Sequence, residues 1–147
     1  MSELLQGACG PARLLPVPTV VDARGALGVL EVGRAVPFAV ERLFYLYGVA
    51  PGAGRGGHAH RKQHQLLVAL AGSFEVRIDN GSASTRVALG RRDECLHVPP
   101  LLWLDLADFS QDAVCAVLSS GGYVEADYLR DAAAFRAAVA EAGGAGR

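Results

Sequence analysis

The sequence predicts an all-β fold with one short helix at its C-terminal end. Short apolar or alternating runs rich in Val, Leu, Tyr and Phe recur through the middle of the chain, and Gly, Pro, Asn and Asp separate them. Strands of this kind, with turn signals at intervals of roughly eight to twelve residues, are typical of a sandwich or a barrel closed on itself. Alternating strand and helix units are therefore not expected.

The strand-like segments can be placed individually. Nine segments fit β-strands, namely residues 27–32, 41–47, 65–71, 74–79, 84–89, 95–98, 103–107, 113–119 and 124–128. The clearest turn between them is Asp79-Asn80-Gly81, because an Asn-Gly pair suits the positive-φ positions of a tight hairpin. Gly72-Ser73 marks a second turn between two apolar segments. We expect these strands to form one barrel over about residues 17–130.

The tail of the chain has helical spacing instead. Beyond Asp131, apolar residues recur at i, i+3, i+4 and i+7, and two glycines follow (Phe135, Ala138, Val139, Ala142 and Gly143-Gly144). This pattern predicts a terminal helix over residues 131–143, capped by Asp131 and docked on the sheet through Phe135.

Composition narrows the class of protein. At 147 residues and 51% hydrophobic, the chain suits a single domain with a substantial core, covering residues 1–147. A formal net charge of −1 with interspersed charges gives no basic stripe for nucleic acid and no polybasic segment for a membrane. The 3 cysteines lack Cys-x-x-Cys spacing and no apolar run is long enough to span a bilayer, so we expect a cytoplasmic location.

The most informative segment is Arg55-Gly-Gly-His-Ala-His60. Side chains two positions apart on an extended segment point to the same side, so His58 and His60 are expected to share one pocket. Two imidazoles that titrate near neutral pH form either part of a metal site or an acid/base pair.

The surrounding residues argue against a metal. A metal-binding β-barrel of the cupin kind supplies a His-x-His pair, a Glu a few residues on and a further His from a distant strand. Here Gln65 occupies the acidic position, Trp103 stands about where the distant His would fall, and His97 is out of place. We therefore expect no metal, and the pair is best explained as acid/base machinery that moves a proton between adjacent carbons.

Further motifs occur in a fixed order around the histidines. They are Asp22-x-Arg24-Gly25, Pro37-Phe38-x-Val40-x-Arg42-x2-Tyr45, Arg55-Gly-x-His-x-His-x4-Gln-x6-Gly-Ser73, Pro99-x3-Trp103, Leu118-x-Ser120-x2-Tyr123 and Asp127-Tyr128-x-Arg130. Together they resemble the cupin-type sugar 3,4-ketoisomerases, the WxcM-like enzymes that act on dTDP-4-keto-6-deoxyglucose. The resemblance covers about residues 17–136.

The resemblance implies a metal-free cupin jelly-roll barrel that converts a dTDP-linked 4-keto-6-deoxy sugar into its 3-keto isomer. The C3 proton lies next to the C4 carbonyl, so an imidazole can remove it to give an enediol that is reprotonated at C4. Nothing is oxidised overall, so no redox cofactor is expected. The resemblance also implies a role in making 3-amino-3,6-dideoxy sugars, and a homodimer in which the N-terminal strand is exchanged between subunits.

Three residues are the catalytic candidates. His58 and His60 are expected to share the chemistry, one taking the proton from C3 and the other relaying a proton at C4 or between the oxygens. The sequence leaves open which histidine does which. Tyr45 is the third candidate, because it lies on a strand expected to line the barrel and its phenol can hydrogen-bond a sugar oxygen.

Five residues are candidates for binding substrate, namely Arg55, Arg24, Lys62, Gln65 and Trp103. Arg55 suits a diphosphate or a developing oxyanion, and Lys62 is a further phosphate partner. Gln65 can hold a sugar hydroxyl or orient a histidine, and Trp103 can wall the pocket. Arg24 would reach the partner's site after strand exchange.

Three alternatives remain open at this point. A nucleotide-sugar 3,5-epimerase-like cupin would need a His/Asp dyad and a tyrosine acid, neither of which the sequence places. A non-catalytic sugar-binding cupin would make the histidine pair incidental. A metal-dependent cupin is disfavoured by Gln65 and Trp103.

Overall fold

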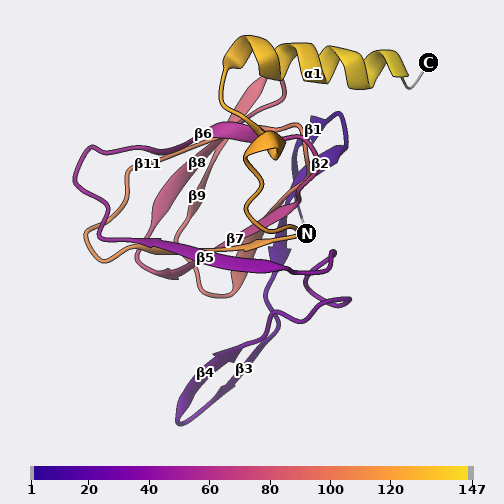
Figure 1. The fold of residues 1–147 in the computed structure, drawn as a ribbon. Helices are drawn as coiled ribbons and strands as arrows, with labels where there is room; N and C mark the ends of the chain where they lie inside the picture. The colour runs from indigo at the N-terminus through magenta and orange to yellow at the C-terminus, as the bar shows by residue number, and fades with distance from the viewer. Residues whose placement is uncertain (1, 146–147) are drawn as a thin grey trace.

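Two stacked β-sheets make up the body of the protein in the computed structural model, which describes residues 2–145 (Figure 1). One sheet contains, in spatial order, β1 (Ser2–Gly7), β2 (Gly10–Pro16), β10 (Glu94–Val98), β7 (Gln65–Ala71), β12 (Val114–Ser119) and β5 (Arg42–Tyr47). The other contains β13 (Tyr128–Leu129), β6 (Arg55–His60), β11 (Trp103–Ala107), β8 (Phe74–Asp79) and β9 (Ser84–Leu89). The result is a jelly-roll-like sandwich.

The core lies between the two sheets because one face of each central strand is apolar. On β8 the residues Phe74, Val76 and Ile78 are buried, while the residues between them are partly exposed. They pack against inward-facing residues of both sheets, including Leu67 on β7 and Leu104 on β11. This period of two is the sequence signal that predicted the strands.

Seven of the nine expected strands occur within one residue of their expected bounds. The expected Asn-Gly hairpin is also confirmed, since β8 and β9 pair from Phe74↔Leu89 to Asp79↔Ser84. In that turn the Asp79 carboxylate accepts a hydrogen bond from the Gly81 amide at 2.6 Å. As expected, Gly72-Ser73 connects two apolar strands, β7 and β8, and it carries the chain from one sheet to the other.

Other expectations need correction. The sheet begins at Ser2 and not near residue 17, because β1 and β2 form a hairpin that joins the sheet through β10. The two sheets do not close into one barrel. The expected strand 27–32 is only the end of β4 followed by loop, and most of 124–128 is a 3₁₀ helix, η1 (Glu125–Asp127).

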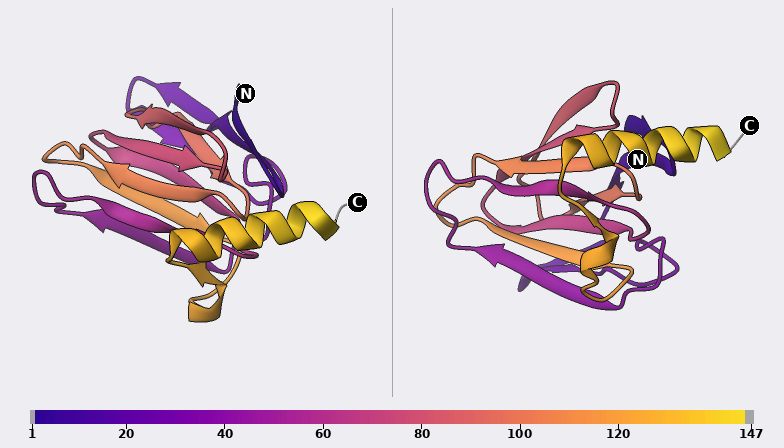
Figure 2. Two further views of the ribbon diagram at one scale, coloured as in Figure 1. Left: turned by 90° about the horizontal axis from the view of Figure 1, so that it is seen from above. Right: turned by 45° about the horizontal axis from the view of Figure 1, so that its top comes forward.

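The C-terminal helix α1 (Ala132–Ala145) forms as expected and runs slightly past the two glycines. The Asp131 carboxylate accepts hydrogen bonds from the Ala133 and Ala134 amides at 3.3 and 3.4 Å, which caps its start. Phe135 is buried against Trp103, with ring centroids 5.6 Å apart. Figure 2 shows that α1 lies on the outside of the sandwich, near β13.

A separate hairpin, β3 (Thr19–Asp22) and β4 (Gly25–Gly28), projects away from the sandwich (Figure 1). We call residues 19–28 the arm. Its apolar side chains are exposed in this single chain, with Val20, Val21 and Leu27 exposed by 60, 72 and 61%. Across residues 2–145, no helix has the length and apolar character needed to cross a membrane.

Candidate active site

A β-bulge sets the direction of the side chains on β6. His58 pairs with Leu104 of β11, but the next pair is Gly56 with Asp105, so Gly57 is left without a partner. Gly56 and Gly57 have φ angles of 83° and 74°, a left-handed conformation that residues with a side chain rarely adopt. The two glycines of the motif therefore serve to build the bulge.

The bulge brings Arg55 to the same side of the sheet as the two histidines. Arg55 is three positions before His58, so regular alternation would place it on the opposite face. With Gly57 bulged out, Arg55 pairs with Leu106 and His58 with Leu104, two leucines of β11 that both face the core. Arg55 and His58 accordingly line one narrow cavity of about 90 Å³ between the sheets.

Replacing Gly56 tests this bulge. A Cβ at this position would lie 2.9 Å from the Leu104 carbonyl oxygen, whereas a Cβ on Gly57 would lie 3.7 Å from its nearest neighbour, Oδ1 of Asp105. We expect Gly56→Ala to lower the free energy of unfolding by about 2–3 kcal/mol, and Gly57→Ala by about 1 kcal/mol. Urea unfolding of the two variants measures the difference, and equal losses would contradict a specific role for the contact at Gly56.

His60 is held at both ring nitrogens. Its Nδ1 lies 2.9 Å from Oδ2 of Asp127, and its Nε2 lies 3.0 Å from the Gln65 side-chain nitrogen. The His60 and Asp127 side chains are only 6 and 7% exposed. A carboxylate only accepts and an amide nitrogen only donates, so Nδ1 carries the proton and Nε2 is left as the basic atom.

Asp127 is itself fixed to the turn that follows β6. Its Oδ1 accepts a hydrogen bond from the Lys62 amide and its backbone carbonyl accepts one from the Arg61 amide, both at 2.8 Å. Burial lowers the pKa of His60, and the hydrogen bond and the charge of Asp127 act against that shift. The site therefore holds a neutral histidine paired with a carboxylate.

His58 has a different environment on the same face. Its ring centroid is 5.2 Å from that of His60, with the two planes nearly perpendicular. Its Nδ1 is buried and has no hydrogen-bond partner among the described residues. Burial lowers the pKa of His58 to about 4, and the neighbouring His60 adds to the effect. His58 is thus neutral at physiological pH.

Tyr128 completes the cluster. It pairs with His60 across the β13–β6 ladder, and its ring centroid lies 5.0 Å from that of His58 and 4.5 Å from that of His60. Sequence reasoning missed both Asp127 and Tyr128 as site residues, although the motif Asp127-Tyr128-x-Arg130 was visible. The His/Asp dyad required by the epimerase alternative is therefore present, so a dyad alone does not separate the two activities.

Two predicted site residues point away from this cluster. Tyr45 is 59% exposed on the outer face of β5, because the inward positions of that strand are Arg42, Phe44 and Leu46. Trp103 lies on the outer face of β11, under Phe135 of α1, while Leu104 faces the core. The expectations that Tyr45 lines the interior and that Trp103 walls this pocket were wrong for this chain.

The remaining predicted residues fall into two groups. Gln65 is buried and contacts His60, in keeping with the suggestion that it orients a histidine. Lys62 is exposed in the turn after β6. Arg24 is at the tip of the arm, paired with Asp22 at 2.6 Å, and its side chain is 89% exposed.

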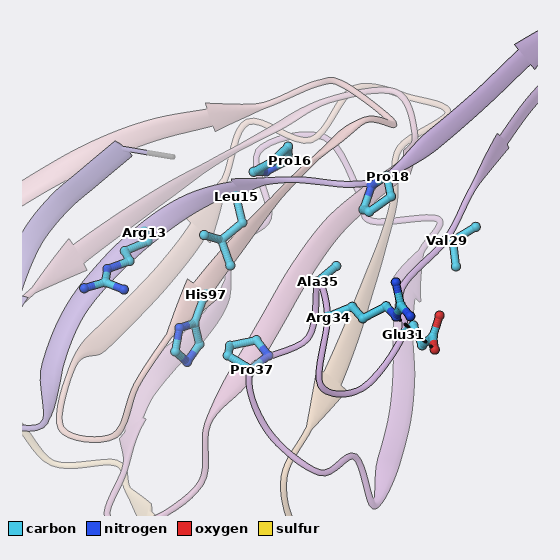
Figure 3. Close-up of a pocket in the computed structure, with 10 residues that line it drawn as sticks. All are labelled: Arg13, Leu15, Pro16, Pro18, Val29, Glu31, Arg34, Ala35, Pro37 and His97. Carbon is cyan, nitrogen blue, oxygen red and sulfur yellow. Dashed lines mark ion pairs between the residues drawn. The ribbon is translucent and has the colours of Figure 1, made fainter.

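A wider groove of about 700 Å³ lies outside the sandwich (Figure 3). One wall is formed by Arg13 and Leu15 of β2 with His97 of β10, and the other by the loop that contains Arg34 and Pro37. His97 also stacks on His64, with its Nε2 3.0 Å from the His64 Nδ1. None of the predicted catalytic residues lines this groove.

The buried histidines make stability depend on pH. Burial lowers the pKa of both His58 and His97 from 6.5 to about 4, so between these values the unfolded chain binds protons that the folded chain excludes. The contribution of these neutral histidines to the free energy of unfolding is complete above pH 6.5 and is lost as the pH falls toward 4. By pH 5 we expect a loss of about 2 kcal/mol per histidine. Urea unfolding at pH 7 and pH 5 measures it, and equal stability at the two would contradict it.

Comparison with known proteins gives concordant matches. The family model FdtA, described as WxcM-like, C-terminal, matches residues 11–140. A TDP-4-oxo-6-deoxy-alpha-D-glucose-3,4-oxoisomerase from Aneurinibacillus thermoaerophilus is 36% identical over 122 residues, which cover 83% of this chain and 88% of the relative.

Two solved structures have the same fold over most of the chain. One is a histidine-to-asparagine mutant of the 3,4-ketoisomerase QdtA from Thermoanaerobacterium thermosaccharolyticum in complex with TDP-4-keto-6-deoxyglucose, with TM-score 0.86, 28% identity and coverage of 88 and 94% of the two chains. The other is a 3,4-ketoisomerase from Helicobacter canadensis, with TM-score 0.85, 32% identity and coverage of 88 and 97%. This chain therefore belongs to the WxcM-like family that the FdtA model describes.

Proposed function

We propose that this protein is a sugar-nucleotide 3,4-ketoisomerase that converts dTDP-4-keto-6-deoxy-D-glucose into the 3-keto isomer, as a step toward 3-amino-3,6-dideoxy sugars. The observation that carries the proposal is the buried cluster in which His60 is paired with Asp127 and lies beside a neutral His58. It occurs in a chain whose relatives are named as 3,4-oxoisomerases and 3,4-ketoisomerases. We also propose that residues 1–147 act as one domain.

His60 is the base in this proposal. With its proton on Nδ1 directed at Asp127, its unprotonated Nε2 can take the C3 proton of the substrate once the Gln65 amide, which donates to that atom at 3.0 Å, gives way to the substrate. The positive charge that develops on the ring is stabilised by the Asp127 carboxylate. His60 then returns a proton to C4, so the C3–H bond is replaced by a C4–H bond.

His58 has the complementary role. A histidine with a pKa of about 4 is neutral at pH 7 and is a poor base, but its N–H can polarise a carbonyl. We assign it to the hydrogen bond with the C4 carbonyl oxygen and to moving the hydroxyl proton from O3 to O4. With this transfer the enediol tautomerises to the 3-ketone. Because the substrate is not oxidised overall, no electron acceptor is needed.

Charged residues around the histidines are proposed to hold the diphosphate. Arg55 lines the cavity next to His58, and Lys62 is exposed in the turn that leads away from His60. A guanidinium binds phosphate oxygens in pairs, which suits Arg55 for this role. No group of three or more His, Cys, Asp or Glu suited to a metal occurs in the part of the chain that the structure describes.

Deuterium labelling tests the activity. The protein is incubated with dTDP-4-keto-6-deoxyglucose in deuterated water and the sugar is followed by NMR. We expect a 3-keto product with deuterium at C4. Label at C5, with inversion there, would indicate an epimerase instead. Binding of dTDP without any change in the sugar would indicate the non-catalytic alternative, and both outcomes would overturn the proposal.

We further propose a homodimer built by exchange of the arm. The arm exposes Val20, Val21 and Leu27, and the outer face of β5 exposes a second apolar patch at Leu43, Tyr45 and Tyr47. In a twofold dimer the arm of each subunit can cover the β5 patch of the other, so that both apolar surfaces are buried. In this arrangement Tyr45 is an interface residue, and Arg24 is carried toward the partner's site. The cytoplasmic location stays a prediction.

The double variant Val21→Asp/Leu27→Asp tests the dimer. Both side chains are exposed in the single chain, so the substitutions leave the sandwich intact. We expect light scattering to show a dimer for the parent protein and a monomer for the variant. A monomeric parent protein, or a variant that stays dimeric, would refute exchange of the arm.

A further inference from the structure

Arg42 is an arginine of the interior that has no role in the proposed mechanism. It begins β5, the edge strand of the six-stranded sheet, and has the same inward phase as Phe44 and Leu46. Phe44 and Leu46 line the cavity that contains His58. Arg42 therefore lies on the β5 face that looks toward the histidine-bearing strand β6.

Its contacts connect the guanidinium to the histidine cluster. One terminal nitrogen lies 3.4 Å from the Tyr128 hydroxyl oxygen, and the Tyr128 ring packs on both histidines. The same nitrogen lies 3.4 Å from the Gln63 side-chain oxygen, and that oxygen also accepts a hydrogen bond from Ser119 at 2.7 Å. The Arg42 Cζ is 5.1 Å from the centre of the Phe44 ring. Aromatic and neutral polar groups thus fix the guanidinium in position.

The charge of Arg42 has no counter-charge among the residues that the structure describes. Within residues 2–145, no carboxylate forms an ion pair with it, whereas Arg13, Arg77 and Arg130 each have at least one carboxylate partner. Its Nε is buried and makes no hydrogen bond in the described chain. Its two hydrogen bonds are long and go to neutral acceptors. A half-buried cation with free donors is unfavourable unless an anion arrives during the reaction.

The proposed isomerisation generates such an anion. Removing the C3 proton places negative charge on the former carbonyl oxygen at C4, and a fixed cation lowers the energy of that species in a site with little water. We propose that Arg42 is a catalytic residue that stabilises the enediolate. This role rests on the proposed function and extends it. The charge of Arg42 also reaches the histidines, because it adds to the lowering of the pKa of His60 that burial causes.

The alternative anion for Arg42 is the substrate diphosphate, and kinetics separates the two. Loss of enediolate stabilisation lowers kcat and the rate of deuterium exchange at C3, and it leaves the Kd for dTDP unchanged. Loss of a diphosphate contact raises that Kd and leaves the exchange rate of bound substrate nearly unchanged. We expect the first pattern in Arg42→Gln, with kcat reduced about 10²- to 10³-fold.

Three variants complete the experiment. Arg136→Gln removes an exposed positive charge on α1 and is expected to keep the parent kcat. Arg42→Lys keeps the charge but not the planar fork, so partial activity is expected. Arg42→Ala is assayed with and without added guanidinium. We expect added guanidinium to raise the kcat of this variant at least tenfold. A purely structural defect would not respond to guanidinium.

The outcomes separate the two proposals. If the parent protein does not isomerise the sugar, the proposed function fails whatever the variants do. If the parent is active but Arg42→Gln keeps its exchange rate, or weakens dTDP binding alone, Arg42 does not stabilise the enediolate. Absence of rescue by guanidinium, with folding unchanged by circular dichroism, also overturns the proposal.

Discussion

The His60→Asn variant is expected to lose about 10³- to 10⁴-fold in kcat, because it removes the base that takes the C3 proton. Asn is close in size to the part of the ring that contacts Asp127, and its side-chain nitrogen can still donate to that carboxylate. The buried Asp127 therefore keeps a partner, and the fold is retained. Deuterium exchange at C3 measures the loss directly, since it reports proton removal without requiring turnover.

Two further variants are compared with His60→Asn, namely His58→Asn at the site and His97→Asn as a control. His58→Asn removes the group that polarises the carbonyl, so we expect a large loss in turnover together with residual exchange at C3. His97 also has a pKa lowered by burial to about 4, but it lines the outer groove. His97→Asn is therefore the matched control and should keep its activity within about fivefold. Equal activity in parent and His60→Asn would assign the base elsewhere.

The strands were predictable because their signal is local. On β8 the alternation of Phe74, Val76 and Ile78 with polar residues specifies both the strand and its buried face. β1 and β2 were missed for the opposite reason, since Gly and Pro occur at their ends and weaken the strand signal. β1 pairs with β2, and β2 joins the sheet by pairing with β10 through Leu14 and Leu96, which a single sequence does not reveal.

The two misplaced site residues are errors of phase, and they differ in how far the sequence could have corrected them. On β5 the run from Leu43 to Tyr47 is apolar on both faces, so alternation does not tell whether Tyr45 or Phe44 points inward. On β11 the signal was present, because Trp103 shares its face with the charged Asp105, while Leu104 lies on the other. The polar face should have identified Trp103 as outward-pointing.

The site itself was predictable only in part. The spacing of His58 and His60 correctly placed both on one face, as their ring separation of 5.2 Å shows. The bulge that adds Arg55 to this face depends on two consecutive glycines with positive φ, and a glycine pair alone does not specify a bulge. Asp127 lies 67 positions from His60 along the chain, so only the folded arrangement of η1 against β6 reveals their contact.

That contact leads to the second large prediction. We expect Asp127→Asn to lower kcat by about 10²- to 10⁴-fold with little change in KM, because the carboxylate that orients the catalytic histidine and stabilises its charged form is lost. An amide nitrogen at this position can donate to Nδ1 and move the ring proton to Nε2, which leaves the basic atom blocked.

The pH profile distinguishes this effect from a simple loss of stability. Asp127 raises the pKa of His60 against the lowering caused by burial, so its removal lowers that pKa further. The acid limb of kcat/KM, which reports protonation of the free base, must then move to lower pH in Asp127→Asn than in the parent protein. A structural defect would lower activity at every pH without moving the limb. A limb that stays in place or moves to higher pH would show that Asp127 does not tune the base, and would leave His60 without the partner on which its assignment depends.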